Sequence, residues 1–247
     1  MKCFRFVFLS CLSFLFSAGV SFAASSLVTD INSVQKIIKN GDTVSLDKMV
    51  ADGLDINMRD EDGNTLLLYA LQNEESYKSA ERLIYHGADL NAPSSVTGMT
   101  PMLWVVTTAE RAQAEMLKKS AQEVAEEELE ERDKKLEKEV LLKMSRAIKI
   151  LRSLIKNNVD VNQETPFGTP LMAALTNEWN KDIIAILIKA GADVNLQDRS
   201  GKTALFYAAA YDCNKIISQL LAAGADTDIK DFDGLTYMDV NKQDLKK

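Results

Sequence analysis

Short apolar runs with helical spacing recur along the chain, and each ends in the same kind of polar turn. One run, at residues 183–188, is followed by Gly191 and the segment Gly-Ala-Asp-Val-Asn. A glycine at this place predicts the end of the helix, because glycine readily adopts the left-handed conformation that closes one. The turn segment recurs at intervals of 34, 71, 33 and 33 residues. Its copies are residues 53–57, 87–91, 158–162, 191–195 and 224–228.

One copy of this turn begins with Asn158 instead of glycine. Asparagine tolerates the left-handed conformation better than other residues that carry a side chain, so the helix is expected to end there as well. A second element marks the helix starts, where a threonine stands ahead of an apolar run and can cap the free N–H groups of the first turn. The threonines are Thr65, Thr100, Thr169 and Thr203.

Together these elements resemble the ankyrin repeat, a unit of about 33 residues with the core motif Thr-Pro-Leu-His-x-Ala. The resemblance covers about residues 28–240. It implies an all-α solenoid of stacked helix pairs with β-hairpin-like finger turns, because one pair alone cannot bury its apolar face. The family's histidine is absent from every repeat, and apolar packing is expected in its place. The residues at that position are Leu68, Leu103, Met172 and Phe206.

The ends of the array are expected to differ from its middle. Residues 24–57 are assigned to an N-terminal linker and a degenerate first repeat, in which 12 residues separate Gly41 from Gly53. Residues 58–240 are assigned to repeats two to five and a partial C-terminal cap repeat, and residues 241–247 to a tail. Atypical terminal units of this kind shield the apolar ends of a solenoid.

Repeat three carries an insertion at about residues 108–146. Thr100 and Asn158 are 58 residues apart, whereas the equivalent Thr203 and Gly224 are 21 apart. The segment contains no Gly or Pro and is rich in Glu, Lys, Ala and Leu, which favour helix. Apolar residues at steps of four and three predict a charged helical hairpin with coiled-coil packing. They are Val140, Met144, Ala147, Leu151 and Leu154.

The hairpin is expected to form by lengthening both helices of repeat three. About 18 extra residues per limb, at a rise of ~1.5 Å each, would project on the order of 27 Å from the solenoid. The turn of the hairpin is expected near residues 126–132. A solvated spacer, a second docking element and a dimerising arm are all compatible with its charge pattern.

Residues 1–23 have the three parts of a signal peptide: Lys2 and Arg5, an apolar stretch at 6–16, and small residues before Ala23. The apolar stretch is 11 residues long, and a membrane span needs roughly 20. We therefore expect cleavage after Ala23 and no stable membrane insertion. The exported chain is expected in the periplasm of a Gram-negative bacterium, with the extracellular space as the alternative. Cys213 would be its only cysteine, which excludes an internal disulfide.

Charge and chemistry argue against nucleic-acid binding and catalysis. The formal net charge of −7 becomes −9 on maturation, because the signal carries two positive charges and no negative one. Binding to nucleic acid normally requires a basic patch. His86 has no accompanying catalytic or metal-binding motif, and the aspartates at 226–233 lack the spacing of a calcium loop. We expect no enzymatic activity, no cofactor and no metal, and a monomer that binds a protein.

The resemblance places partner contacts on the concave face, formed by the finger tips and the first helix of each pair. Phe167, Tyr211 and Phe232 stand out because aromatic anchors dominate interface energies. The pattern puts them at tips rather than in the core, with packing on a neighbouring finger as the alternative. Trp104 is expected to pack within a core helix. The partner-binding residues that the resemblance implies are Glu61, Asp62, Asn64, Met99, Pro166, Phe167, Asn177, Arg199, Lys202, Tyr211 and Phe232.

The resemblance thus implies a non-catalytic protein-binding module, an exported scaffold or adaptor that binds one protein through its concave face. One alternative is an immunity or inhibitor protein for an exported toxin or enzyme. Another is a secreted effector that binds a host protein.

Overall fold

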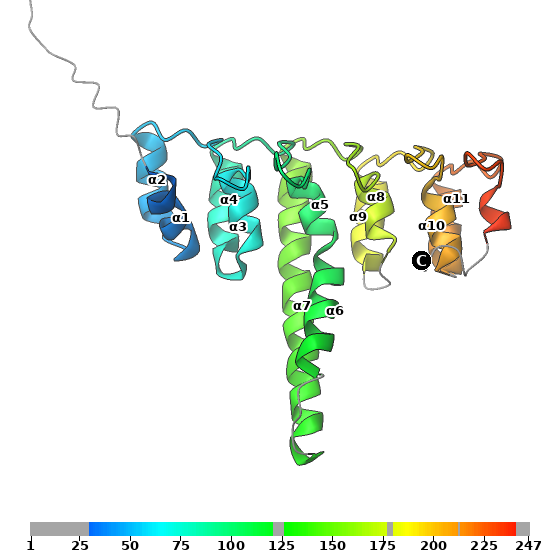
Figure 1. Cartoon of the computed structure of the whole chain (residues 1–247), viewed down its shortest axis with the longest axis horizontal. Coiled ribbons are helices and arrows are strands. Elements are labelled where there is room, and N and C mark those ends of the chain that lie inside the picture. Colours follow the sequence, from blue (N-terminus) through cyan, green and yellow to red (C-terminus); the bar gives the residue numbers. More distant parts are fainter. Residues whose placement is uncertain (1–29, 121–125, 177–179, 212, 241–247) are drawn as a thin grey trace, which may run out of the picture.

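The computed structural model of the chain describes residues 30–120, 126–176, 180–211 and 213–240. Its helices form antiparallel pairs that stack side by side in a row, with a turn linking each pair to the next (Figure 1). The signal peptide expected at residues 1–23, the residues that follow it up to 29, and the tail at 241–247 lie outside the described residues.

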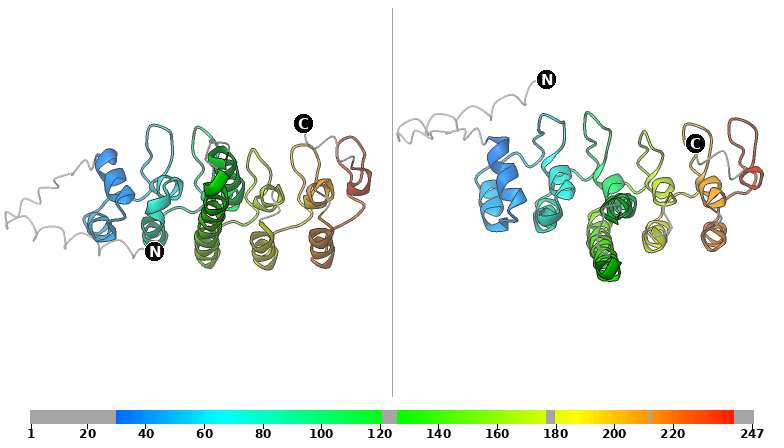
Figure 2. Two further views of the ribbon diagram at one scale, coloured as in Figure 1. Left: turned by 90° about the horizontal axis from the view of Figure 1, so that it is seen from below. Right: turned by 60° about the horizontal axis from the view of Figure 1, so that its bottom comes forward.

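Each pair contains an inner and an outer helix, and the finger turns project on the side of the inner helices (Figure 2). The inner helices are α1 (Ile31–Lys39), α3 (Leu66–Gln72), α5 (Pro101–Val106), α8 (Pro170–Ala174) and α10 (Ala204–Ala210). The outer helices are α2 (Thr43–Ala51), α4 (Tyr77–Tyr85), α7 (Glu126–Lys156), α9 (Lys181–Lys189) and α11 (Asn214–Ala222). Short 3-10 helices lie at Glu74–Ser76 and Tyr237–Asp239. The described residues contain only isolated β-bridges, so the predicted all-α solenoid is confirmed.

The outer helices end as the sequence predicts. Gly191 follows α9 with φ of 90°, a left-handed conformation that closes the helix. No atom lies within 4 Å of where a Cβ would stand, so the backbone conformation alone favours glycine at this position. Asn158 has φ of 61° and is the only described residue other than glycine with a positive φ. The prediction that asparagine replaces glycine there is confirmed.

Three of the four predicted threonine caps form. The hydroxyls of Thr65, Thr100 and Thr169 accept hydrogen bonds from the backbone N–H three residues later, at 3.1–3.3 Å. Thr203 also stands at the start of its helix, but its side chain makes no capping hydrogen bond. The prediction was wrong for this hydroxyl. Thr203 is nevertheless almost fully buried, so it still occupies the same place between the repeats.

A single apolar core runs through all the pairs, from Val34 in α1 to Leu220 in α11. The residues that replace the family's histidine are all buried, which confirms apolar packing at that position. They are Leu68, Leu103, Met172 and Phe206. Because each pair contributes one stripe to this core, the array depends on contact between neighbouring repeats.

The insertion forms an arm, which consists of α6 (Thr108–Ser120) packed against the first two-thirds of α7. The arm leaves the solenoid at the end of the helices away from the fingers (Figure 1). The predicted apolar seam is confirmed, since its members are all buried. They are Val140, Met144, Ala147, Leu151 and Leu154, with Leu136 one step further out. No described helix is both long enough and apolar enough to cross a membrane.

The predicted position of the hairpin turn was wrong. Residues 126–132 lie within α7, and the connection between α6 and α7 falls at residues 121–125, outside the described residues. The acidic, helix-favouring residues at 126–132 contain no Gly or Pro to end a helix, so α7 begins at Glu126.

Candidate protein-binding surface

A ladder of asparagine side chains joins each repeat to the next. The Oδ1 atom of Asn162, at the end of the repeat-three turn, accepts a hydrogen bond from the backbone N–H of Asp193 at 2.8 Å. Equivalent bonds of 2.8–2.9 Å join the other repeats: Asn57 to Asp89, Asn91 to Asp160, and Asn195 to Asp226. The bond between Asn91 and Asp160 spans the insertion, so the arm leaves the register of the array unchanged.

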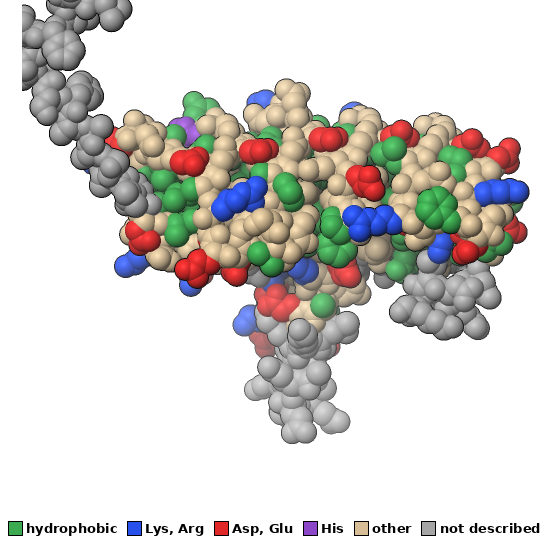
Figure 3. Space-filling model, turned by 45° about the horizontal axis from the view of Figure 1, so that its top comes forward, with side chains coloured by type: hydrophobic (Ala, Val, Ile, Leu, Met, Phe, Trp, Pro, Cys, Tyr) green, Lys and Arg blue, Asp and Glu red, His purple; other side chains and the backbone are tan. Residues whose placement is uncertain are grey.

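The aspartate of each turn holds the asparagine in position. Its carboxylate accepts a hydrogen bond from the asparagine backbone N–H two residues later, for example from Asn195 to Asp193 at 2.9 Å. In the last turn Asp228 replaces the asparagine, and its N–H still donates to Asp226 at 2.8 Å. Thus the recurring Asp-x-Asn pattern serves both the turn and the junction between repeats. Its aspartates are exposed along one edge, where Figure 3 shows a row of acidic side chains.

Neighbouring fingers also contact one another directly. The N–H of Phe232 donates to the carbonyl of Ser200 at 3.1 Å, and Gln197 Nε2 donates to the carbonyl of Lys230 at 2.9 Å. Phe232 lies so close to Gly201 that an added Cβ would come within 2.6 Å of its ring. The fingers are therefore fixed by their neighbours as well as by their own turns.

We use the term finger face for the surface formed by the finger turns and the exposed sides of the inner helices. Large apolar side chains are exposed at three finger tips: Val96 is 71% exposed, Phe167 58% and Phe232 75%. Phe232 also contacts Gly201, so exposure and packing on the neighbouring finger coexist at this residue. Apolar side chains that are open to solvent, on fingers whose backbone contacts the neighbouring finger, are the feature of this surface best suited to binding a protein.

Tyr211 is not at a finger tip, contrary to expectation. It is the C-cap of α10 and 42% exposed, at the end of this inner helix away from the finger. The sequence pattern placed Tyr211 at a tip, and this prediction was wrong because the pattern does not give the distance of a residue from the finger. A partner that contacts Tyr211 and Phe232 together must therefore cover the length of the inner helix.

The other predicted contact residues differ in accessibility. Asn64 is wrong as a contact residue, because it is only 7% exposed and its Oδ1 accepts a hydrogen bond from Gln72 Nε2 at 3.4 Å. Asn177 lies outside the described residues. Met99 and Lys202 are half-buried. The exposed members of the set are Glu61, Asp62, Pro166 and Arg199.

The C-terminal cap adds exposed apolar residues that the prediction omitted. Leu235 and Met238 are both exposed, in and just beyond the last finger. Their segment was interpreted only as a shield for the last repeat. The finger face therefore extends into the cap.

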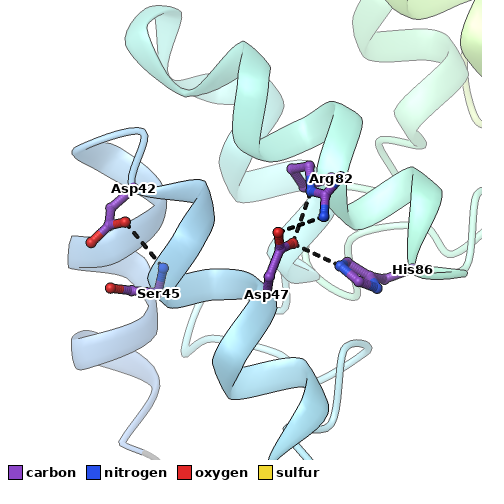
Figure 4. A network of polar contacts seen from close by, with 5 residues as sticks. All are labelled: Asp42, Ser45, Asp47, Arg82 and His86. Atoms are coloured by element: carbon purple, nitrogen blue, oxygen red, sulfur yellow. Dashed lines mark hydrogen bonds and ion pairs between the residues drawn. The ribbon is translucent and has the colours of Figure 1, made fainter.

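The only histidine belongs to a polar network on the outer helices (Figure 4). Arg82 donates to Asp47 from Nε at 2.8 Å and from Nη2 at 2.5 Å, and His86 Nε2 lies 2.8 Å from Asp47 Oδ1. The hydrogen bonds from Arg82, and then that from His86, lower the pKa of Asp47. Asp47 thus contributes stability above its ordinary pKa, which is lost as the pH falls through the lowered value. The network links α2 to α4 and is explained by packing between repeats.

Catalytic chemistry finds little support in the described residues. They contain no group of three or more His, Cys, Asp or Glu side chains placed to hold a metal ion. The Tyr207 hydroxyl donates to Asp198 Oδ2 at 2.5 Å, and burial followed by this bond raises the pKa of Tyr207. A tyrosine with a raised pKa keeps its proton, so this pair stabilises the finger instead of supplying a base. Cys213 is free, half-buried and precedes α11.

Comparisons with known proteins agree with this architecture. The family model described as "Ankyrin repeats (3 copies)" matches residues 142–231, and the model of a single ankyrin repeat matches residues 62–95. No curated protein matches the sequence. Among solved structures, an ankyrin repeat domain from Acinetobacter baumannii AYE is 25% identical, with a TM-score of 0.62, over 85% of this chain and 89% of its own.

Two further solved structures have the same fold. The ankyrin repeat protein EF0377 is 23% identical, with a TM-score of 0.61, over 87% of this chain and 92% of its own. The third structure contains a predatory endopeptidase from Bdellovibrio bacteriovorus in complex with an immunity protein. The matching chain is 22% identical, with a TM-score of 0.57, over 86% of this chain and 92% of its own. By its repeats and its fold, this chain belongs to the ankyrin-repeat family, whose members generally serve as protein-binding modules.

Proposed function

We propose that this chain is an exported, non-catalytic scaffold that binds one protein partner across its finger face. The observation that carries the proposal is the exposure of Val96, Phe167 and Phe232 on fingers that their neighbours hold in place. A finger whose backbone is already held loses little conformational entropy when it becomes part of an interface. Contacts of this kind commonly supply most of the binding energy.

The first experiment tests the finger face with two matched variants. Phe167→Ala combined with Phe232→Ala removes two exposed aromatic rings from the fingers. Tyr85→Ala combined with Leu141→Ala removes two exposed apolar side chains from α4 and the arm, outside the finger face. A partner is captured from fractions of the native cell with the mature chain, identified and purified, and its affinity for each variant is then measured by calorimetry.

We expect the finger variant to weaken binding at least tenfold, since the loss of a central aromatic anchor costs about 2 kcal/mol or more. The control variant should bind as the unsubstituted chain does. Equal affinity of both variants for the partner would show that the finger face is not the interface. Tyr211→Ala, measured alongside, tests whether contact extends to the far end of α10.

Export is the second part of the proposal, and residues 1–23 support it. The intact mass of the protein isolated from the periplasm of its native host should correspond to a chain that begins at Ala24. Retention of residues 1–23 in that mass would contradict cleavage. Recovery from the culture medium, with the periplasm empty, would instead favour the secreted effector.

An immunity or inhibitor protein is the second candidate. Its support is the likeness in fold to a chain from the complex of a predatory endopeptidase with an immunity protein. In that case the captured partner should be an exported hydrolase or toxin, and adding one equivalent of this chain should abolish its activity. A partner whose activity is unchanged when fully bound would favour the scaffold.

A further inference from the structure

A pocket of about 270 Å³ lies in the corner between repeat two and the arm. Its walls are the end of α3 and the turn after it, the start of α4, the C-terminal half of α5, and the base of α6 and α7. The corner therefore lies at the end of the helices opposite the fingers (Figure 1). We call it the corner pocket, and its principal residues are Leu71, Tyr77, Trp104, Arg111, Lys143 and Arg146.

Arg111 is the unusual residue of this pocket. Its guanidinium carbon lies 3.7 Å from the centre of the Trp104 ring. Its Nη2 atom donates to the Trp104 carbonyl at 2.5 Å and to the Thr108 hydroxyl at 3.0 Å, and its Nη1 atom donates to the Thr107 hydroxyl. No carboxylate of the described residues forms an ion pair with it. Of the five N–H groups of the guanidinium, these bonds use three, which leaves Nε–H and one Nη1–H without an acceptor in the described chain.

Burial of this cation has an energetic cost that its surroundings only partly offset. Desolvation lowers the pKa of Arg111 to about 10, although the neighbouring Glu110 acts in the opposite direction. At neutral pH the group is still charged. Buried charges in proteins are normally paired, because an unpaired one costs several kcal/mol. A half-buried arginine without a carboxylate, in the wall of a pocket, is therefore placed to receive an anion.

The other charges of the pocket limit the charge of that anion. Lys143 forms ion pairs with Glu115 at 2.6 Å and Glu139 at 3.4 Å, and Arg146 lies 5.0 Å from the centre of the Tyr77 ring. Arg111 carries one positive charge, so one negative charge balances it, whereas a dianionic phosphate would bring a second negative charge close to Glu115, which lines the same pocket.

Apolar side chains make up much of the remaining wall. The Trp104 indole is fixed by a hydrogen bond from Nε1 to the Leu71 carbonyl at 2.9 Å, so its ring presents a rigid surface to the pocket. The other apolar lining residues are Ala70, Leu71, Val105, Ala112, Ala147 and Ile150. A ligand that fills the pocket therefore needs an apolar body next to its anionic group.

We propose that the corner pocket binds a monocarboxylate that carries an apolar group, and that Arg111 holds the carboxylate. The Nε–H of Arg111, which has no acceptor in the described chain, would donate to one carboxylate oxygen, while the apolar group packs against Trp104. A volume of about 270 Å³ is smaller than most sites for drug-sized ligands and suits a single apolar amino-acid residue with its α-carboxylate. Such a group occurs in a free acylated amino acid and at the C-terminus of a polypeptide.

The experiment uses the mature chain and two pairs of probes. N-acetylphenylalanine is compared with N-acetylphenylalaninamide, which has the same shape without the negative charge. A hexapeptide of glycine and serine that ends in phenylalanine is compared with its C-terminally amidated form. Binding is measured by NMR titration at probe concentrations up to about 10 mM, because a ligand of this size is expected to bind with an affinity on the order of millimolar.

We expect the two acids to bind at least tenfold more tightly than their amides. This difference is measured on the unsubstituted protein, so it does not depend on whether a variant folds. Arg111→Gln should reduce the affinity for the acids at least tenfold, the typical effect of losing a charge-assisted hydrogen bond. Arg111→Lys, which keeps the charge, should restore part of it. Arg152→Gln, at an exposed arginine further along α7, is the matched control and should bind as the unsubstituted chain does.

Binding of the peptide acid without the free acid assigns the site to polypeptide C-termini, and binding of both or of the free acid alone assigns it to carboxylates in general. Equal binding of acids and amides, or no binding by any probe, overturns the proposal. Acid binding that survives Arg111→Gln in a protein with unchanged circular dichroism overturns the role of Arg111. The site is independent of the finger face, since Phe167→Ala with Phe232→Ala should leave these titrations unchanged.

Discussion

The solenoid and the arm are built from similar helices but are held in place differently. In the solenoid, every pair packs on its neighbours and a hydrogen bond such as that from Asp193 to Asn162 ties one repeat to the next. In the described part of the arm, the two helices pack on each other through an apolar seam that reaches Leu136. An ion pair from Lys143 to Glu115 joins them near the base, where the arm meets the solenoid.

The difference shows which parts of the chain depend on one another for their stability. In a repeat array, each interface contributes to the folding of the units on both sides, so damage at one position is felt by the whole chain. In the arm, local opening near the tip breaks few other contacts, and such segments can unfold separately from the rest. The same substitution should therefore have different effects in the two regions.

The largest effect is expected from Leu154→Ala, at a fully buried residue near the end of α7 where it crosses the solenoid. Loss of the side chain should lower the free energy of unfolding by about 3 kcal/mol, through lost burial and the cavity it leaves. Leu136→Ala in the arm should lower it by less than about 1 kcal/mol, because the helices there can fray locally. Urea unfolding followed by circular dichroism measures both. Equal losses would mean that the arm folds as one unit with the solenoid.

An intermediate effect is expected from Asn162→Ala, which removes one rung of the asparagine ladder. The backbone N–H of Asp193 would lose its acceptor, at a cost of about 1 kcal/mol in the free energy of unfolding. Asn214→Ala, at an exposed asparagine in α11, is the control and should change this free energy by less than about 0.5 kcal/mol. If the two variants have the same urea midpoint, water replaces the lost hydrogen bond with no cost in the free energy of unfolding.

The smallest effect is expected from shortening the arm. Replacing residues 117–134 by a four-residue turn of glycine and asparagine keeps Leu136, Lys143 and the corner pocket. The urea midpoint of the solenoid should not change measurably, because the stability of a repeat array depends mainly on the contacts between neighbouring repeats, which this change leaves in place. The affinity of a partner bound at the finger face should also be unchanged. A lower affinity after shortening would show that the partner reaches the arm.

Much of the fold could be predicted because residues within each repeat mark where its helices begin and end. Threonine and glycine mark helix starts and ends through local backbone chemistry, and even Asn158 was interpreted correctly from its tolerance of positive φ. The hairpin turn could not be placed, since the residues around Glu126 favour helix throughout and contain no Gly or Pro to mark an end. The ladder was also missed, because its hydrogen bonds join turns that are about 30 to 70 residues apart.

The candidate surfaces were less predictable than the fold. The family pattern gives the face on which a residue lies but not its exposure, and so Asn64 was wrongly included although it is buried and hydrogen-bonded to Gln72. Arg111 was overlooked within a segment of many charges, although its contacts with Trp104, Thr107 and Thr108 are local in sequence. The pocket beside it also needs residues of other elements, such as Leu71 and Tyr77, and the repeat pattern does not predict how these meet the base of the arm.

The asparagine ladder has a consequence for how such a gene can change in length. Each asparagine ends its own repeat, and its side chain accepts the hydrogen bond that joins this repeat to the following one. A tandem duplication of residues 163–195 would therefore place a new asparagine beside Asp226 and leave Asp228 at the terminus. Whole repeats can therefore be inserted or deleted in frame without changes to the neighbouring repeats. The length of the binding surface can evolve in steps of one repeat.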